Sequence, residues 1–293
     1  MSMRWRRAIG RGIFAPDVKA FQAEAQEDPV RARGRYLVEG LGHCGAGHTP
    51  RSITRQEKAL TNEEGSDYLA GSSAPIDGWT ASNLRGDNRD GLGRWSEGDL
   101  RQFLRYGRND QTAAFGGMTD VVEHSLQHLS EADITAIARY LKSLGAKDPH
   151  QAAFSVDDAT AKALWRGDDS QTGAATYVDS CAACHKTDGS GYKRFYPALR
   201  GNPVVMADDP TSLIHIVLVG GQLPGVNGAP STITMPAFGW RLNDQQVADV
   251  VNFVRNSWGN KASEQVSAKQ VAELRKDEKD RLGSADIRVL EGK

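Results

Sequence analysis

Residues Cys181-Ala182-Ala183-Cys184-His185 decide how the rest of this 293-residue chain is interpreted. On a helix, positions i, i+3 and i+4 share one face, so both thiols and the imidazole address a ligand from the same side. A flat porphyrin meets this demand, because two thiols can add to its two vinyl groups while the adjacent imidazole reaches the iron. The string is therefore typical of covalent haem c attachment.

Two other uses of a Cys-x-x-Cys pair fit this chain less well. A structural zinc site wants four ligands, usually from two such pairs, and the whole chain has 3 cysteines. A thioredoxin-like pair expects a surrounding βαβ pattern, whereas the apolar periodicity here is helical. Haem c attached at Cys181 and Cys184, with His185 on the iron, is the favoured interpretation.

A second axial ligand is expected from the opposite face of the ring. Met235, within Thr234-Met235-Pro236-Ala237-Phe238, stands where a loop could deliver its thioether, although a lone methionine is usually core filler. Ligation by His185 and Met235 raises the reduction potential and leaves no open iron position, which favours electron transfer. We also expect the Pro197 carbonyl to face the other ring nitrogen of His185 and fix its tautomer.

The same succession of elements occurs twice along the chain. In each copy a helix leads into the cysteine and histidine string, and a middle helix follows after irregular chain. A methionine then lies in a loop that is expected to lead directly into a last amphipathic helix with a clear N-cap. First copy then second, the expected elements are helices over 31–42 and 172–180, helices over 97–106 and 211–219, Met118 and Met235, and last helices after Ser130 and Asn243.

The first copy reads Cys44-Gly45-Ala46-Gly47-His48 and so lacks the second cysteine. Because His48 and Met118 are both present, the iron of a second haem could still be six-coordinate. That haem would be attached through Cys44 by a single thioether. A loosely bound haem and a haem-free remnant that only docks to a partner are the alternatives.

The expected fold is mainly helical with long loops, since no segment shows sustained strand alternation bounded by hairpin turns. The 31 glycines, 11 prolines and 39% hydrophobic residues point to small cores. The charged tail is expected to be largely solvated, with one short helix after Ser267. We place an N-terminal arm at 1–28, a first domain at 29–149, a linker at 150–166, a second domain at 167–261 and the tail at 262–293.

The charge of the sequence argues against nucleic acid as a partner, and its hydropathy argues against a membrane-spanning segment. The formal net charge of -1 offers nothing to hold a nucleic acid by counterion release. No apolar run approaches the roughly 18 to 20 residues that span a bilayer. Residues 1–15 contain no apolar core long enough for a signal peptide. Because haem c is attached outside the bacterial cytoplasm, we nevertheless expect a periplasmic location, peripheral to the inner membrane.

From Arg31 to Asn260 the chain resembles the cytochrome c subunits of membrane-associated bacterial dehydrogenases that act on alcohols, gluconate, sorbitol or aldehydes. The resemblance implies two tandem class I-like cytochrome c domains, equivalent to the second and third of three haem domains. It also implies a periplasmic dehydrogenase as electron donor and ubiquinone or a terminal oxidase as acceptor. The strings that carry it are Gly34–Gly40, Gly93–Ser96, Val121–Ser125, Met235–Trp240 and Arg255–Gly259.

The chain departs from that family in four ways. We expect it to lack a first haem domain, a signal peptide and a hydrophobic tail, and Gly47 replaces a cysteine. A truncated gene, an excised piece and a diverged two-domain relative all fit. A dihaem peroxidase is a competing enzymatic function, because it also has two domains of this size, but it needs an iron whose distal ligand can leave.

Overall fold

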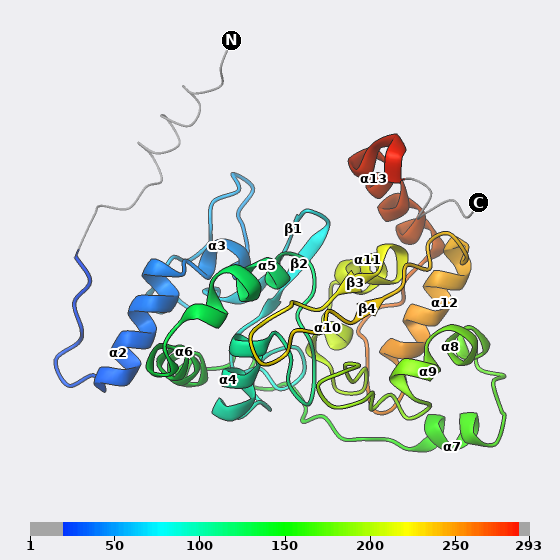
Figure 1. Ribbon diagram of the computed structural model, residues 1–293, viewed down its shortest axis with the longest axis horizontal. Coiled ribbons are helices and arrows are strands. Elements are labelled where there is room, and N and C mark those ends of the chain that lie inside the picture. Colours follow the sequence, from blue (N-terminus) through cyan, green and yellow to red (C-terminus); the bar gives the residue numbers. More distant parts are fainter. Residues whose placement is uncertain (1–19, 287–293) are drawn as a thin grey trace, which may run out of the picture.

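A computed structural model describes residues 20–286 of the chain, with side chains up to Glu278. Residues 1–19 of the expected arm and residues 287–293 of the expected tail lie outside the described part. Figure 1 shows helices joined by long irregular segments and arranged in two halves side by side. The mainly helical fold with long loops is confirmed.

The first half contains the helices α2 to α6 and one small antiparallel sheet. Its helices alternate with irregular chain, as the glycine content indicates. In chain order the elements are α2 (Pro29–Arg35), a π-helical stretch (Tyr36–Leu41), α3 (Gly45–His48), a 3-10 turn (Asn62–Glu64), β1 (Ala70–Ile76), β2 (Trp79–Asn83), α4 (Glu97–Tyr106), α5 (Gly117–His124), a 3-10 turn (Leu126–His128) and α6 (Glu131–Ser143).

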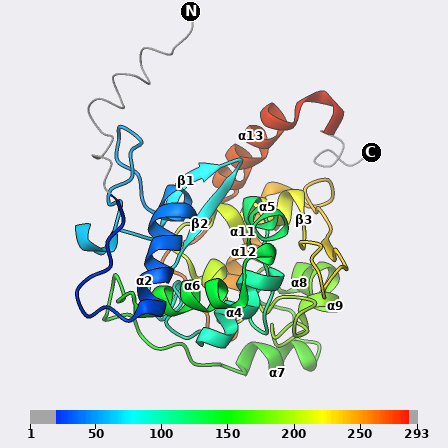
Figure 2. The same cartoon turned by 60° about the vertical axis from the view of Figure 1, so that its left-hand side comes forward.

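The second half repeats the order of helices and adds a two-residue strand pair. Figure 2 shows α13 leaving the body of the molecule along one side. The elements are α7 (Ala159–Trp165), α8 (Ala174–Ser180), α9 (Ala182–His185), α10 (Pro203–Met206), α11 (Thr211–Val219), β3 (Gly221–Gln222), β4 (Thr234–Met235), α12 (Asp244–Arg255) and α13 (Ala268–Asp286).

Helix starts and middle helices agree with the sequence prediction. Helix α6 begins after Ser130, whose side chain accepts a hydrogen bond from the Asp133 amide at 3.1 Å. Helix α12 begins after Asn243, which forms a reciprocal capping box with Gln246. Helices α4 and α11 cover 97–106 and 211–219, as predicted. These ends are correct because a cap is a local interaction that sequence spacing specifies.

In both halves a glycine lies where the helix before the cysteine string packs against a later helix, α6 in the first half and α12 in the second. A β-carbon on Gly34 would lie 2.0 Å from the carbonyl oxygen of Ala136 in α6. A β-carbon on Gly173, at the start of α8, would lie 2.2 Å from the carbonyl oxygen of Asp249 in α12. Only glycine permits such backbone approach, so the two copies share this packing device.

Each half has its own hydrophobic core, and a third cluster joins the halves. The first core includes Val38, Ile134 and Tyr140, whereas the second includes Tyr177 and Trp258. The third cluster consists of Ala114 and Val122 from the first half with Val226 from the second, and all three are buried. The halves are therefore connected by packing as well as by the chain.

The expectation that no segment forms a strand hairpin is wrong for residues 70–83. Strands β1 and β2 pair antiparallel, with Ala70 opposite Asn83 and Ile76 opposite Trp79. Asp77 and Gly78 form the turn, with φ of 50° and 85°. An Asp-Gly pair of positive φ is the preferred two-residue hairpin turn, so the sequence did contain a signal.

The helix expected after Ser267 is present and most of the described tail is exposed, but the helix is longer than expected and is anchored on the second half. Helix α13 runs for 19 residues and packs against α11 and α12. Val266 and Val271 are fully buried in the second core. Arg275 donates to Asp244 Oδ1 at 2.7 Å and to the Leu242 carbonyl at 2.9 Å. These two valines anchor the tail, although most of its residues are charged or polar.

Within residues 20–286, the helices are all too short or too polar to cross a membrane.

Candidate functional site

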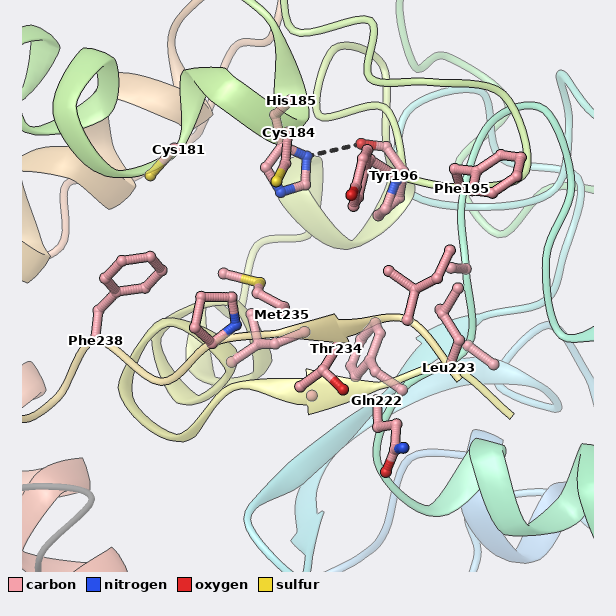
Figure 3. A pocket seen from close by; sticks show the side chains of 18 of the residues that line it. Cys181, Cys184, His185, Phe195, Tyr196, Gln222, Leu223, Thr234, Met235 and Phe238 are labelled. Atoms are coloured by element: carbon pink, nitrogen blue, oxygen red, sulfur yellow. Dashed lines mark hydrogen bonds between the residues drawn. The ribbon is translucent and has the colours of Figure 1, made fainter. Parts of the chain in front are cut away.

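The second half contains a pocket with about 730 Å³ of empty space, part of it open to solvent. In Figure 3 the side chains of Cys184 and His185 lie on one side of this pocket and that of Met235 lies on the other. Most lining residues are apolar. Besides Cys181, Cys184, His185 and Met235, they include Ala113, Ala114, Phe115, Phe195, Tyr196, Pro197, Ile216, Leu223, Ile233, Pro236 and Phe238.

The imidazole of His185 is buried and held by the backbone. Its Nδ1 lies 2.9 Å from the carbonyl oxygen of Pro197, the contact that the sequence predicted. A carbonyl only accepts, so Nδ1 carries the proton and Nε2 keeps its lone pair. Burial lowers the pKa of His185, and the hydrogen bond to Pro197 partly opposes this. The ring is therefore a neutral nitrogen donor at neutral pH.

The segment after His185 folds back to deliver the Pro197 carbonyl. The Gly191 amide donates to the His185 carbonyl at 3.0 Å, which closes a tight loop. The hydroxyl of Tyr177 donates to the Lys186 carbonyl at 2.6 Å, and Trp258 Nε1 donates to the Thr187 carbonyl at 2.9 Å. Both aromatic side chains belong to the second core, so this core fixes the orientation of the imidazole.

The two thiols of the second half share the imidazole side of the pocket. Cys181 caps α9, and Cys184 lies one turn later, directly before His185. Burial, with a smaller contribution from the neighbouring Cys184, raises the pKa of the Cys181 thiol to about 12. The Cys181 thiol is thus un-ionised at neutral pH and is not an activated nucleophile.

Met235 approaches the pocket from strand β4. Its backbone pairs with Gly221 in β3, and the next segment is fixed to the end of α11 by a bond from the Phe238 amide to the Val217 carbonyl at 2.9 Å. The side chain is partly buried against the second core. A thioether at this place can act as a soft metal donor opposite the imidazole.

The residues of this pocket fit haem c. The walls are mainly apolar, as a porphyrin requires, and the two thiols lie on the same side as a neutral imidazole with a free Nε2. A soft sulfur donor lies on the opposite side. Cys181 and Cys184 would hold the ring covalently, with His185 and Met235 as the candidate axial ligands.

The equivalent residues of the first half reproduce only the imidazole side. Cys44 caps α3 and His48 ends it. The Nδ1 of His48 lies 2.8 Å from the Ser82 carbonyl, so its Nε2 also remains available. Burial lowers the pKa of His48 and raises that of Cys44 to about 11. A β-carbon on Gly47 would have nothing within 4 Å, so the second thiol is missing although there is space for it.

The prediction that Met118 lies in a loop leading directly into the last helix is wrong. Met118 lies in the first turn of α5, and a 3-10 turn separates α5 from α6. Its side chain packs against the third cluster, which contains Ala114, Val122 and Val226, whereas Cys44 packs against the first core. Apolar residues at Met118, Val121 and Val122 with an acidic first-turn residue were the missed helix signal.

Within the described first core, two buried side chains carry donors without a protein partner. Among the described residues, the Tyr68 hydroxyl and the Trp95 Nε1 have no hydrogen-bond partner, although both side chains are at most 5% exposed. Orphaned buried donors are costly unless an acceptor meets them, and a porphyrin carboxylate is such an acceptor. Burial raises the pKa of Tyr68, with Glu39 and Cys44 adding to the effect.

The first half adds a wall to the second-half pocket that the sequence did not predict. Ala113, Ala114 and Phe115 line it, although they come from the segment between α4 and α5. Phe115 also packs on Trp79 of β2, with ring centroids 5.2 Å apart. Spacing along a sequence carries no signal for a contact between halves, so only the structure could reveal this wall.

The chain is similar to known proteins over nearly all its length. Residues 170–258 match the family model described as Cytochrome c. The gluconate 2-dehydrogenase cytochrome c subunit of Pantoea cypripedii is 76% identical over 294 residues, covering 99% of this chain and 67% of that protein. The cytochrome c subunit of quinone alcohol dehydrogenase from Gluconacetobacter polyoxogenes is 51% identical, covering 94% and 59%.

A more distant relative extends the same pattern. The fructose dehydrogenase cytochrome subunit of Gluconobacter japonicus is 37% identical, covering 89% of this chain and 56% of that protein. The chain thus spans between about half and two thirds of the length of these relatives. With the high identity and the geometry of the pocket, the comparison shows that the chain belongs to the family of cytochrome c subunits of gluconate 2-dehydrogenase and quinone alcohol dehydrogenase.

Proposed function

We propose that this chain carries single electrons as the cytochrome c subunit of a periplasmic dehydrogenase of the alcohol, gluconate or aldehyde type. The observation that supports this most strongly is the pair of opposed donors, His185 and Met235, across an apolar pocket that carries two thiols. Two axial ligands leave no iron position for a substrate, so the site would exchange electrons rather than transform a molecule.

Haem c bound in this pocket would supply a one-electron couple at its iron. The protein residues then set its properties. Cys181 and Cys184 hold the ring through thioethers, and the Pro197 carbonyl keeps His185 in the tautomer that ligates through Nε2. The sulfur of Met235 favours the reduced state, and the apolar walls exclude water. The sulfur donor and the apolar walls favour a relatively high reduction potential, whereas the hydrogen bond from His185 to the Pro197 carbonyl makes the imidazole a stronger donor.

The partner and the compartment follow from the relatives and from the cofactor. The relatives are named as subunits of gluconate and alcohol dehydrogenases, so we infer a catalytic dehydrogenase subunit as electron donor. Ubiquinone or a terminal oxidase is the inferred acceptor. Covalent haem attachment implies the periplasm, and the relatives do not favour a dihaem peroxidase.

We further propose a second haem in the first half, attached by one thioether to Cys44 and ligated by His48. The orphaned donors Tyr68 and Trp95 support it, as does the held Nδ1 of His48. Met118 is the proposed sixth ligand. The alternative is that this half contains no haem and serves as a docking module, which its packing against the second half also supports.

The direct test is mass spectrometry of the chain after export to the periplasm of a strain with haem-attachment machinery. We expect haem on the peptide that contains Cys181 and Cys184, and none there in the Cys181→Ala, Cys184→Ala double variant. The holoprotein should be reduced by a gluconate or alcohol dehydrogenase subunit in the presence of its substrate. A wild-type chain without covalent porphyrin at this peptide refutes the proposal. Rapid peroxide turnover would support the peroxidase instead.

The axial role of Met235 has its own test. Replacement by leucine should abolish the sulfur-to-iron charge-transfer absorption and lower the midpoint potential, because the soft donor is lost. Met206→Leu is the matched control, since Met206 is buried in the same half but does not line the pocket. Equal spectra and potentials for both variants would exclude Met235 as a ligand.

A further inference from the structure

Arg108 lies where the first half packs against the second half. It follows Gly107, the C-cap of α4, which has a φ of 65°. A β-carbon on Gly107 would lie 2.3 Å from Pro224 Cγ, in the segment that joins β3 to β4. The left-handed glycine therefore turns the chain so that Arg108 points towards this segment rather than continuing the helix.

The guanidinium of Arg108 donates to three backbone carbonyls of the second half. Nη2 reaches the carbonyls of Ala229 at 2.7 Å and Ser231 at 3.2 Å, and Nη1 reaches the carbonyl of Arg194 at 3.4 Å. The residue is 6% exposed. Its own backbone forms a bridge with Ala113, which lines the pocket.

These carbonyls belong to the two segments that carry the opposed sides of the pocket. Arg194 stands three residues before Pro197, whose carbonyl holds the imidazole of His185. Ser231 stands four residues before Met235, the sulfur on the other side. One side chain thus ties the imidazole-holding segment and the sulfur-bearing segment to each other.

Neighbouring contacts support the same connection. The Asn227 amide donates to Gln127 Oε1 at 3.0 Å, and the Thr119 hydroxyl donates to the Gln222 carbonyl in β3 at 3.3 Å. Val226 is buried in the third cluster against first-half residues. Each of these contacts lies on the hairpin that carries the sulfur, whereas Arg108 alone among them also reaches the imidazole side.

The charge of Arg108 is buried, and the backbone of the same residue pairs with Ala113, which lines the pocket. Its Nε has no hydrogen-bond partner among the described residues, and burial lowers the pKa of its guanidinium. A guanidinium stays protonated even so. A buried cation beside an iron site disfavours the more positive, oxidised state.

We propose that Arg108 is a positioning residue of the second-half site, through which the first half fixes the spacing of His185 and Met235. The inference rests on the proposed function and adds a role for the first half that does not require haem there. A loosened hairpin should let the sulfur leave the iron more readily. Loss of the nearby cation should lower the reduction potential.

The test compares Arg108→Met, Arg108→Lys and the control Arg105→Met in the full-length holoprotein. Arg105 lies in the last turn of α4 and donates to two carbonyls, Gln127 at 2.6 Å and Leu129 at 2.8 Å, but both belong to the first half. Arg108→Met should bind added imidazole about tenfold more tightly than wild type, the least expected for losing one charged hydrogen bond. Its oxidised form should be favoured about tenfold, or about 59 mV for a one-electron couple.

The outcomes separate the inference from the function on which it rests. Arg108→Lys keeps the charge but loses the planar fork, so it should bind imidazole more tightly with a smaller shift in potential. If Arg108→Met does not accumulate as holoprotein, the imidazole affinity of Arg108→Lys is the measurement that decides the test. If the variants contain haem and have the imidazole affinity and reduction potential of the wild type, only the inference is overturned. A wild-type chain without haem at Cys181 and Cys184 overturns the function.

Discussion

Replacing Gly47 by cysteine tests whether the first half is a haem site that lacks only one attachment point. A β-carbon at this position would have nothing within 4 Å, so the substitution should cause no steric strain. Gly47 lies within α3, where glycine is about 0.3 kcal/mol or more less favourable than cysteine. The variant should therefore be at least as stable as the wild type before any haem is considered.

The expected gain is a second thioether at the first site. After maturation, intact mass should show two haems per chain, and the first should be linked through both Cys44 and the introduced thiol. Saturating the second vinyl group should also move the pyridine haemochrome band of that haem to shorter wavelength. Gly47→Ser is the matched control, because it adds a side chain of similar size that cannot form a thioether.

Two results would refute the reasoning behind this substitution. If wild type and Gly47→Cys both contain one haem, located at Cys181 and Cys184, the first half is not a haem site. If both Gly47 variants lose more than about 1 kcal/mol in urea unfolding, a side chain does not fit at this position as the structure indicates.

Two further predictions concern stability. A hydrogen bond from Lys193 lowers the pKa of Asp110. This carboxylate therefore stabilises the fold above about pH 3.9, and the stabilisation is lost as pH falls through the lowered pKa. Asp110→Asn should cost up to about 1 kcal/mol at pH 7, and urea unfolding should show that this difference vanishes in strong acid. His215 Nδ1 lies 3.0 Å from Glu278 Oε1 with both side chains at most 3% exposed, so Glu278→Ala removes a buried partner and should cost about 1 to 3 kcal/mol. The exposed Glu273→Ala in the same helix should cost less than about 1 kcal/mol, and equal losses for the two would show that the tail is not anchored by this pair.

Local signals explain which parts of the structure the sequence could predict. The starts of α6 and α12 depend on Ser130 and Asn243, whose side chains bond to amides three residues away. The Pro197 contact was predictable because a histidine that ligates a metal needs its other nitrogen held, and the segment returning towards His185 is short. In each case the cause and the effect lie within a few residues or one repeated unit.

The sequence also contained two local signals, for a hairpin and for a helix, that other patterns in the sequence outweighed. Asp77-Gly78 indicated a hairpin, yet the flanking strands have no clean alternation because both contain small polar residues. Met118 was assigned to a loop by analogy with Met235, although its own neighbours have helical spacing. The repeat was a sound guide to the order of helices and a poor guide to the residues between them.

Contacts between the halves leave no trace in sequence spacing. Phe115 reaches a pocket whose cysteines stand more than sixty residues later, and Arg108 reaches carbonyls still further along the chain. Backbone carbonyls exist at every residue, so no residue type marks those that accept from Arg108. Such a contact can be found only when the three-dimensional arrangement is known.

The same contacts explain why a defect in the first attachment string need not make the first half dispensable. Arg108 and Phe115 belong to the segment after α4, far in sequence from Gly47, and they act on the pocket of the second half. The missing thioether at Gly47 would weaken haem binding in the first half but leave these contacts unchanged. The number of haems and the integrity of the second site are therefore separate properties. A chain with a single haem would still need its first half to hold Met235 opposite His185.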